Sequence, residues 1–501
     1  MDLLNSLALG FSVAVTWQNL LYCFAGVLMG TLIGVLPGLG PVTTVALLLP
    51  ITFALDPVSS LIMLAGIYYG AQYGGSTTAI LVNLPGESSS VVTAIDGYKM
   101  ARAGRAGPAL GIAAIGSFIA GTFATIVIAA FAPVLGSVAL KFGAVEYFSL
   151  IVFGLVASII LAQGSILKAL AMVVLGLLLG QVGTDPTSGV YRYTLGFSTL
   201  ADGISFVALS MALFGIAEVI FNLQKGEERV DGVVENVGRV LPTRQDMMDS
   251  APAIARGTLL GSLLGLLPGG GALLASFAAY TLESKVAKHP RRFGHGDIRG
   301  VAAPEAANNA GAQTSFIPML TLGLPANPVM AMMIGAMMIQ GIQPGPQVMT
   351  SQPQLVWGLI ASMWIGNVML ILLNLPLIRV WVALLKVRYT YMFPAIILFC
   401  CIGAYSVHNS GFDVMLMAVL AIGGFILLKL RCEPAPLILG FILGPMMEEN
   451  LRRALLISRG NFGVFLDKPI SLGFLIASAL LLAAIAIPGV LKLRQTAMAA
   501  Q

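Results

Sequence analysis

The chain has 501 residues, of which 57% are hydrophobic and only 10% are charged, and its formal net charge is +5. Soluble domains carry about 25% charged residues, so this composition excludes a soluble enzyme and indicates a polytopic membrane protein. At roughly 20 apolar residues for each crossing, the apolar segments allow about ten to fourteen spans or re-entrant pieces. The positive charge fits basic cytoplasmic loops and does not indicate binding to nucleic acid.

The first long apolar segment, residues 17–36, ends in a motif that occurs twice in the chain. Residues 26–40 read GVLMGTLIGVLPGLG and residues 257–271 read GTLLGSLLGLLPGGG, with nine of fifteen positions identical at a constant offset of 231. Small residues at every fourth position allow another helix to approach closely in lipid. The Leu-Pro-Gly-x-Gly that follows ends a helix, because proline removes a hydrogen-bond donor and glycine admits other backbone angles.

Both copies of this motif predict a helix that is broken inside an apolar segment. Such backbone is tolerated at membrane depth only where it is buried in protein or lines a cavity, and its free N–H and C=O groups can bind ions or substrate. Paired interruptions in the two halves of a membrane protein are typical of a transporter's binding site. The alternative is a Pro/Gly kink that only packs two helices together.

A second break follows in the first half. Residues 42–55 continue the apolar run, and residues 58–95 stay apolar overall but are crowded with small and hydroxyl residues. The sequence NLPGESSS at 83–90 interrupts this segment at its Pro-Gly pair. The next loop has three basic residues between positions 99 and 105, which places it in the cytoplasm.

The middle of the chain poses a question of topology. Residues 222–256 are hydrophilic and are predicted to be a cytoplasmic linker, and a basic loop at 283–300 follows the second LPGxG motif. If both are cytoplasmic, residues 257–282 enter and leave on one side as a re-entrant hairpin. If residues 257–282 span the membrane, one basic segment breaks the positive-inside rule. We favour the hairpin.

Plain spanning helices are expected at 108–139, 145–161, 166–182 and 201–221 in the first half, and apolar helices at 354–383, 391–402, 412–429, 434–447 and 469–493 in the second.

The segment after the basic loop mirrors the first half. The tripeptide GAQ at 70–72 recurs at 311–313, an offset of 241, and the dipeptide LP at 84–85 recurs at 324–325, an offset of 240. Each half therefore contains an LPGxG break followed by an LP break. We predict an all-α polytopic membrane protein with two homologous halves, residues 1–221 and 257–501, arranged as inverted repeats with discontinuous helices or re-entrant hairpins at these motifs.

The order of four long motifs resembles that of a known family. These motifs are GVLPGLGPVTT, YYGAQYGGSTTAILVNLPGE, GLLPGGG and APEAANNAGAQTSFIPMLTLGLPANP, and they are similar to those of the large membrane subunit of tripartite tricarboxylate transporters, the TctA family. The resemblance covers nearly the whole chain. It implies a bacterial inner-membrane permease, surrounded by lipid, that works with a small four-helix membrane subunit and a periplasmic solute-binding protein. Together these take up small carboxylates such as citrate, driven by an ion gradient, without a cofactor.

The paired motifs contain no Lys or Arg, so the carboxylate substrate that the resemblance implies would be held by helix N-termini and by hydroxyl and amide donors. The candidate substrate-binding residues are Ser76, Thr77, Thr78, Asn83, Ser88, Asn309, Thr314, Ser315 and Asn327.

Two carboxylates, Glu87 and Glu305, lie in the same segments. A bound Na⁺ or a proton would cancel their repulsion of an anionic substrate, which gives a physical route to coupling. The alternative for each is a carboxylate at a loop edge in water or at a helix cap. Thr43 and Thr44, just beyond the first break, can cap a new half-helix. The candidate residues for the coupling ion are Gly38, Gly40, Thr43, Thr44, Glu87, Gly269, Gly271, Glu305 and Asn308, with no metal expected beyond Na⁺.

The predicted function is thus secondary active uptake of small carboxylates. A channel is the alternative, but it needs a continuous polar pore lining, whereas the polarity of this chain is concentrated at the breaks. An intramembrane enzyme needs a catalytic dyad or a metal motif such as HExxH, and the three histidines form none. No GxxxxGK[ST] loop is present, so the sequence carries no ATP-binding machinery of that kind.

Overall fold

The structure is a computed structural model that describes residues 3–84, 86–139, 141–161, 165–185, 187–225, 237–267, 271–287, 292–345, 347–387 and 389–483. Contacts divide the chain into two compact units. Unit 1 comprises Met1–Ser137 and Phe206–Phe425, and unit 2 comprises Val138–Ser205 and Ile426–Gln501. This division describes packing, and the division into repeats at 1–221 and 257–501 stays a prediction.

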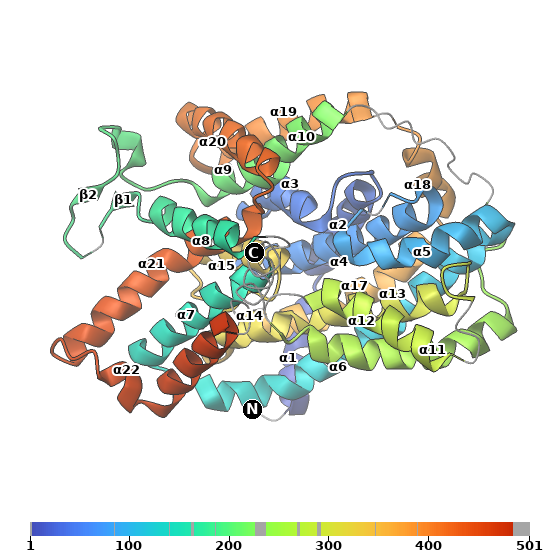
Figure 1. The fold of residues 1–501 in the computed structure, drawn as a ribbon, viewed down its shortest axis with the longest axis horizontal. Coiled ribbons are helices and arrows are strands. Elements are labelled where there is room, and N and C mark those ends of the chain that lie inside the picture. The colour runs from blue at the N-terminus through green and yellow to red at the C-terminus, as the bar shows by residue number, and fades with distance from the viewer. Residues whose placement is uncertain are drawn as a thin grey trace, which may run out of the picture. The chain divides into compact units, whose positions relative to one another are not determined.

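Unit 1 begins with the helices of the first half, whose colour runs from blue to cyan in Figure 1. They are α1 (Leu3–Ala14), α2 (Trp17–Gly34), α3 (Pro41–Phe53), α4 (Pro57–Val82), the 3₁₀ turn η1 (Ser88–Ser90), α5 (Val91–Met100), the π-helical η2 (Ala101–Arg105) and α6 (Ala106–Ala139), whose last residues belong to unit 2.

The rest of unit 1 comes from the middle and second half of the chain. Its elements are α9 (Phe206–Ser210), η4 (Met211–Ile216), α10 (Ala217–Lys225), α11 (Arg244–Leu264), α12 (Gly271–Val286), α13 (Arg299–Thr314), α14 (Phe316–Leu322), α15 (Pro328–Ile339), α16 (Val348–Ser351), α17 (Pro353–Asn374), α18 (Ile378–Leu384), α19 (Tyr389–His408) and α20 (Gly411–Lys429), which ends in unit 2. Because α11 starts at Arg244, part of the predicted linker is helical.

Unit 2 consists of apolar helices and one small hairpin. Its elements are α7 (Ala144–Leu161), α8 (Ile166–Gly180), β1 (Gly183–Thr184), β2 (Tyr191–Arg192), η3 (Ser198–Leu200), α21 (Pro434–Ile457), α22 (Val464–Asp467) and a helix at Pro469–Ala483. The two strands are antiparallel, with Gly183 opposite Arg192. Glycines bring α8 and α21 together, since a Cβ on Gly176 would lie 2.0 Å from the carbonyl oxygen of Leu437.

Six helices among the described residues are long and apolar enough to cross a membrane. They are Trp17–Gly34, Ser88–Phe131, Phe206–Gln224, Pro353–Asn374, Tyr391–His408 and Gly411–Lys429. Six further apolar helices of 10–17 residues accompany them. The composition of these helices agrees with the multi-pass membrane protein that the sequence predicts.

The helices end where the sequence predicts breaks. In the first half, α2 ends at Gly34 and α3 begins at Pro41, with Gly38 in the left-handed region at φ 84° between them. α4 ends at Val82, and Asn83 takes the left-handed C-cap conformation at φ 57°. Asparagine is one of the few non-glycine residues that adopt this conformation readily.

The second half repeats this pattern. α11 ends at Leu264 and α12 begins at Gly271, while residues 268–270 lie outside the described residues. α14 ends at Leu322 with Gly323 left-handed at φ 67°, and α15 then starts after the N-cap Asn327, whose side chain accepts from the amide of Met330. Gly323 follows Asn83 by the same 240 residues that separate the two LP dipeptides.

The expectation that Thr43 and Thr44 cap α3 is wrong. The N-cap is Gly40, which makes no side-chain bond, and Pro41 occupies the first turn. Proline fixes φ near the helical value and has no N–H to satisfy, so the helix starts without a hydroxyl cap. Thr44 instead donates to the carbonyl of Gly40, and Thr43 donates to the carboxylate of Glu218 in α10.

Glycines hold α2 directly against α4. A Cβ added to Gly26 or Gly30 would lie 2.3 Å from the carbonyl oxygen of Met63 or Ile67, respectively. Only glycine permits such a backbone approach. In lipid, close packing of this kind drives helix association, so the glycine face of the repeated motif fixes the position of α4.

The second copy of the motif holds α11 against α13 in the same register. Gly257 and Gly261 face the carbonyl oxygens of Ala303 and Ala307, at 2.4 and 2.3 Å from an added Cβ. Each glycine follows its first-half counterpart by 231 residues, and each partner follows its counterpart by 240. Figure 1 shows α11, α12 and α13 side by side, in agreement with their packing.

Candidate functional site

The site is built on α4 and α13, two helices that are buried along almost their whole length. Every residue of α4 from Ser59 to Leu81 is buried, and so is every residue of α13 from Gly300 to Thr314. α13 nevertheless carries a carboxylate, two asparagines and a glutamine. Buried polar groups are costly unless they are hydrogen-bonded, so these side chains must find partners across helices.

Glu305 of α13 lies at the centre of this arrangement with only 1% of its surface exposed. Ser76 Oγ of α4 donates to its Oε2 at 2.8 Å, and Thr93 Oγ1 of α5 donates to its Oε1 at 2.6 Å. Among the described residues no Lys or Arg forms an ion pair with it. Two hydroxyls from the first half therefore hold a carboxylate of the second half.

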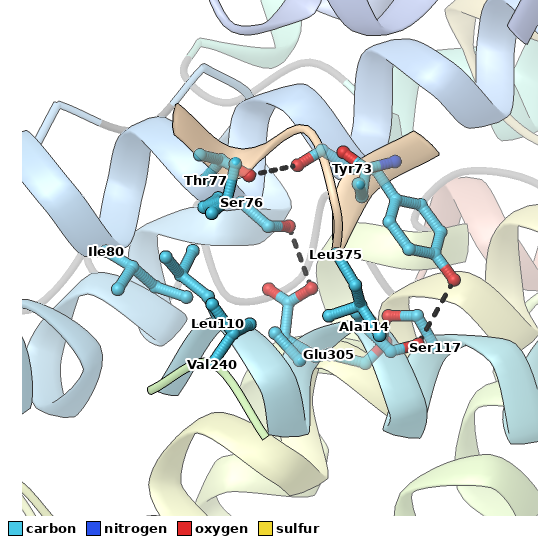
Figure 2. A pocket seen from close by; sticks show the side chains of 13 residues that line it. Tyr73, Ser76, Thr77, Ile80, Leu110, Ala114, Ser117, Val240, Glu305 and Leu375 are labelled. Atoms are coloured by element: carbon cyan, nitrogen blue, oxygen red, sulfur yellow. Dashed lines mark hydrogen bonds between the residues drawn. The ribbon is translucent and has the colours of Figure 1, made fainter. Parts of the chain in front are cut away.

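A small pocket opens beside Glu305. Figure 2 shows the Glu305 carboxylate pointing towards Ser76, with Tyr73 and Ser117 on the neighbouring wall. Asn374 also lines this pocket, and its buried Oδ1 accepts no hydrogen bond from a described residue. The pocket thus places one unsatisfied amide oxygen near a buried carboxylate, and oxygen ligands of both kinds suit hard cations.

A second set of contacts joins the LP breaks to the buried helices. Asn308 Nδ2 donates to Glu87 Oε1 at 2.8 Å, and Asn327 Nδ2 donates to the hydroxyl of Tyr68 at 3.3 Å. Gln72 lies between them, with its Nε2 3.2 Å from Asn308 Oδ1 and 3.4 Å from the Tyr68 hydroxyl. These five side chains form one chain of hydrogen bonds that crosses from one half to the other.

Other predicted substrate-binding residues lie close by, but most of their hydroxyls donate hydrogen bonds to backbone carbonyls. Thr77 and Thr314 donate to carbonyls one turn back in their own helices, and Thr78 and Ser315 donate to the carbonyls of Val35 and Gly265 beside the LPGxG breaks. Asn309 donates to Ser117 Oγ at 2.6 Å. Asn83 and Ser88 are exposed at the LP break.

Among the glycines predicted to bind the coupling ion, one in each half brings the LPGxG break close to the LP break of the same half. A Cβ on Gly40 would lie 3.0 Å from the carbonyl oxygen of Gly86, and one on Gly271 would lie 3.9 Å from that of Ala326. Gly38 faces the side chain of Asn222. Gly269 lies outside the described residues, so its predicted role stays a prediction.

Three polar segments of unit 1 are tied together away from this cluster. The buried carboxylate of Asp96 in α5 accepts from the backbone amides of Gly294, Gly296 and Asp297 at 2.7–3.0 Å. Lys99 donates to the carbonyl of Gly294. Burial acts to raise the pKa of Asp297, but hydrogen bonds from Arg299 outweigh it and lower that pKa.

The start of α11 joins the same group of segments. Thr243 and Asp246 form a capping box, and Arg105 donates to Asp246 at 2.5 Å. Thus the basic stretch at 99–105, the end of the linker and the loop before α13 all meet. Since α11 and α12 both have an end there and pack against each other, they form a hairpin. Arg256 of α11 bonds Glu283 of α12 through two contacts of 2.8 and 2.9 Å.

Three partners in the cluster were not predicted from the sequence: Tyr68, Gln72 and Thr93. Each lies inside a helix, and each contacts a residue of the other half more than 200 positions away. The sequence feature that could have predicted these partners is the offset between equivalent positions of the two halves. GAQ at 70–72 was matched to 311–313, but the packing register is 240, which pairs Gln72 with Ala312 and Tyr68 with Asn308.

Comparison with known proteins identifies the family. The sequence pattern described as "Tripartite tricarboxylate transporter TctA family" matches residues 20–439. A 52.8 kDa protein in the TAR-I ttuC' 3' region of Agrobacterium vitis is 59% identical over 475 residues, which is 95% of this chain and 94% of the relative. A protein in the TAR-II ttuC' 3' region of the same organism is 60% identical over 215 residues, 43% of this chain and 89% of the relative. No solved structure matches the chain. The matched range and the hydrophobic helices together establish that the chain is a multi-pass membrane protein of the TctA family, a component of tripartite tricarboxylate transporters.

Proposed function

We propose that the chain is the permease of a secondary transporter that takes up small organic carboxylates across the bacterial inner membrane. A small four-helix membrane subunit and a periplasmic solute-binding protein would complete the system, and Na⁺ or H⁺ would drive it. The observation that carries this proposal is the cluster around Glu305 and Glu87, where carboxylates, hydroxyls and amides meet and no described Lys or Arg bonds either carboxylate.

The chemistry of the cluster supports coupling between a cation and an anion. A bare carboxylate repels a carboxylate substrate, so Glu305 or Glu87 must be neutralised before an anion can bind beside it. A bound Na⁺ or a proton does this, and the surrounding hydroxyl and amide oxygens suit Na⁺. Because the anion binds only after the cation has neutralised the carboxylate, the two solutes are transported together. Neither solute is chemically changed.

The helical pattern supports two inverted repeats. Each proposed half pairs its glycine-rich helix with its polar helix in the same register, as Gly26 with Met63 and Gly257 with Ala303. Each half also contributes to both units, because residues 1–137 and 206–221 of the first half and residues 257–425 of the second half lie in unit 1. We further propose that α11 and α12 form a re-entrant hairpin entered from the cytoplasm, because both of its ends meet the basic segments.

The experiment is uptake of labelled citrate, and of a panel of other carboxylates, into proteoliposomes that contain the chain and its two proposed partners. Saturable uptake that needs an inward Na⁺ or pH gradient supports the proposal. A Na⁺ requirement identifies Na⁺ as the driving ion, whereas dependence on the pH gradient alone assigns the carboxylates to proton transfer. Uptake that rises linearly with concentration and needs no gradient would instead indicate a channel.

Glu305→Gln tests the carboxylate within this assay. Its shape is kept and its charge is lost, so uptake should lose its dependence on the cation gradient. The matched control is Glu449→Gln, because Glu449 is exposed in unit 2 and pairs only with Arg453 one turn away among the described residues. A Glu305→Gln variant with the cation dependence of the native chain would contradict the proposed role of the cluster.

A further inference from the structure

The two LP breaks carry different residues at equivalent positions. The packing register of 240 residues matches Glu87 with Asn327, and Tyr68 with Asn308. Glu87 and Asn327 both follow the LP dipeptide by the same spacing, and both are half-exposed. Tyr68 and Asn308 are both buried, with at most 2% of their surface exposed. The matched positions therefore have the same burial in the two halves.

The contacts are exchanged between the halves in the same way. Asn308 of the second half bonds Glu87 of the first at 2.8 Å, and Tyr68 of the first half bonds Asn327 of the second at 3.3 Å. When Asn308 is replaced by its counterpart Tyr68 and Glu87 by its counterpart Asn327, the first pair becomes the second. The site thus consists of two half-sites of the same construction, each made of one residue from a break and one residue from the opposite half's buried helix.

The two half-sites differ in chemistry. Glu87 presents a carboxylate, to which Asn308 Nδ2 donates, and Asn308 Oδ1 accepts from Gln72 Nε2. Carboxylate and amide oxygens are the ligands that hard cations take. Tyr68 and Asn327 present a hydroxyl and an amide without a carboxylate. Asn327 also begins α15, a helix of 12 residues whose N-terminus favours negative charge.

Gln72 supplies an independent indication of a ligand. It lies between the half-sites, bonded to Asn308 and Tyr68 through Nε2, and is only 1% exposed. Its Oε1 accepts no hydrogen bond from a described residue. A buried acceptor without a donor is costly, so a bound cation or a donor on the substrate is expected to satisfy it.

We propose that the difference between Glu87 and Asn327 divides the transport site into a cation half, formed by Glu87 and Asn308, and an anion half, formed by Tyr68 and Asn327. Gln72 joins the two halves. The carboxylate of the substrate binds the Tyr68 hydroxyl and the Asn327 amide at the start of α15, while the driving cation binds the Glu87 carboxylate and the Asn308 amide oxygen. This inference rests on the proposed transport function and assigns its two ligands to separate residues.

The test measures two quantities in the citrate uptake assay, the KM for citrate at saturating cation and the cation concentration for half-maximal uptake at saturating citrate. Tyr68→Phe removes one hydroxyl, and Asn327→Asp adds a charge while keeping an N-cap acceptor for Met330. Both should raise the KM for citrate by about tenfold, the effect of one lost hydrogen bond to a charged ligand. The half-maximal cation concentration should stay within about twofold of its native value, since these two residues do not touch the cation.

Glu87→Gln should give the opposite result. It should raise the half-maximal cation concentration by about tenfold or abolish the dependence, and leave the KM for citrate within about twofold at saturating cation. The matched control is Tyr69→Phe, because the Tyr69 hydroxyl is buried beside Tyr68 but has no partner among the described residues. It should change neither quantity.

The outcomes separate this inference from the proposed function. If the native chain takes up none of the carboxylates tested, the proposed function fails. If the native chain transports citrate but Tyr68→Phe and Glu87→Gln shift both quantities by the same factor, the division into halves is wrong while the transport function stands. A reversed assignment, with Glu87→Gln acting on citrate alone, would also overturn it.

Discussion

At the scale of single residues, the buried carboxylate of Glu305 depends on two hydroxyl donors from the first half. Thr93→Val keeps the shape of the side chain and removes the donor to Oε1. We expect a loss of about 1–3 kcal/mol in stability, the cost of leaving a buried polar group unsatisfied. Citrate uptake should fall by about tenfold. Thermal unfolding in detergent and uptake in proteoliposomes measure the two effects.

The control for this prediction is Thr52→Val. Thr52 is also fully buried, but its hydroxyl donates to the carbonyl of Leu49 in its own helix. That carbonyl belongs to the helix ladder, so its loss should cost little and leave uptake unchanged. Equal losses of uptake in both variants would show that the Thr93 hydroxyl has no special relation to Glu305.

Asn83 offers a prediction about backbone conformation. It is exposed and left-handed at φ 57°, and Gly323 holds the same position in the second half. Asn83→Gly should keep both stability and uptake, because glycine adopts this conformation without cost. Asn83→Ala should destabilise by about 1 kcal/mol. Thermal unfolding and citrate uptake distinguish a backbone role of Asn83 from a substrate-binding role. A stable Asn83→Gly variant without uptake would show that the amide binds substrate.

The sequence predicted the carboxylates and asparagines of the cluster but not their partners Tyr68, Gln72 and Thr93, nor that Ser76 bonds Glu305. Glu87, Glu305, Asn308 and Asn327 stand out because they are polar in segments that must pass through an apolar environment. Their partners do not stand out, since a tyrosine or threonine inside a helix fits ordinary packing. Ser76 lies 229 residues from Glu305, and a contact over such a separation depends on how the two halves pack, which residue patterns do not specify.

At the scale of elements, the hairpin of α11 and α12 depends on one ion pair. Glu283 is buried, with 2% of its side chain exposed, while Arg256 is 37% exposed. Arg256→Met should leave an unpaired buried carboxylate and lower the stability by about 1–3 kcal/mol, less than for a fully buried pair because the arginine is partly in contact with solvent. The measurement is the thermal unfolding midpoint of the purified chain.

A double variant completes this prediction. Adding Glu283→Gln to Arg256→Met removes the uncompensated charge, so it should restore about half of the lost stability. If the double variant is less stable than Arg256→Met alone, the two residues act independently, and the ion pair does not hold the hairpin.

Element boundaries were predictable where proline and glycine determine them. The breaks after Gly34 and Val82 follow from LPGLG and NLPGE, since these residues cannot continue a helix. The capping role of Thr43 and Thr44 was wrong, because Pro41 already starts α3. The β-hairpin at 183–192 was not predicted, since two-residue strands leave almost no pattern in a sequence.

At the scale of the whole molecule, the boundary between the two proposed halves does not coincide with the boundaries of the two compact units. Each proposed half contributes to both units, so the repeat found in the sequence does not predict the units. Within unit 1, however, the halves interlock through α4, α5 and α13. This explains why a polar residue such as Glu305, which looks unsatisfied in the sequence, finds its hydrogen-bond partners in the other half.

The arrangement of the basic segments gives a prediction for the topology of unit 1. The stretch at 99–105, the start of α11 and the loop before α13 are joined by Lys99 to Gly294 and by Arg105 to Asp246. Single cysteines at the exposed positions Arg102, Gln245 and His295 should therefore react with a membrane-impermeant maleimide from the same side. By the positive-inside rule that side is the cytoplasm, so inside-out vesicles should be labelled and right-side-out vesicles should not.

Ala54→Cys provides the opposite reference for this labelling experiment, in a background carrying Cys401→Ser and Cys432→Ser. Ala54 is exposed just before α4, whose 26 residues extend about 39 Å at 1.5 Å per residue, longer than a hydrocarbon core of about 30 Å. α5 then continues past the end of α4, with Gly97 against Ile80, so Ala54 should lie on the side opposite to Arg102 and be labelled from outside. If the cysteine at His295 is labelled together with the one at Ala54, residues 257–282 span the membrane, and the re-entrant hairpin is wrong.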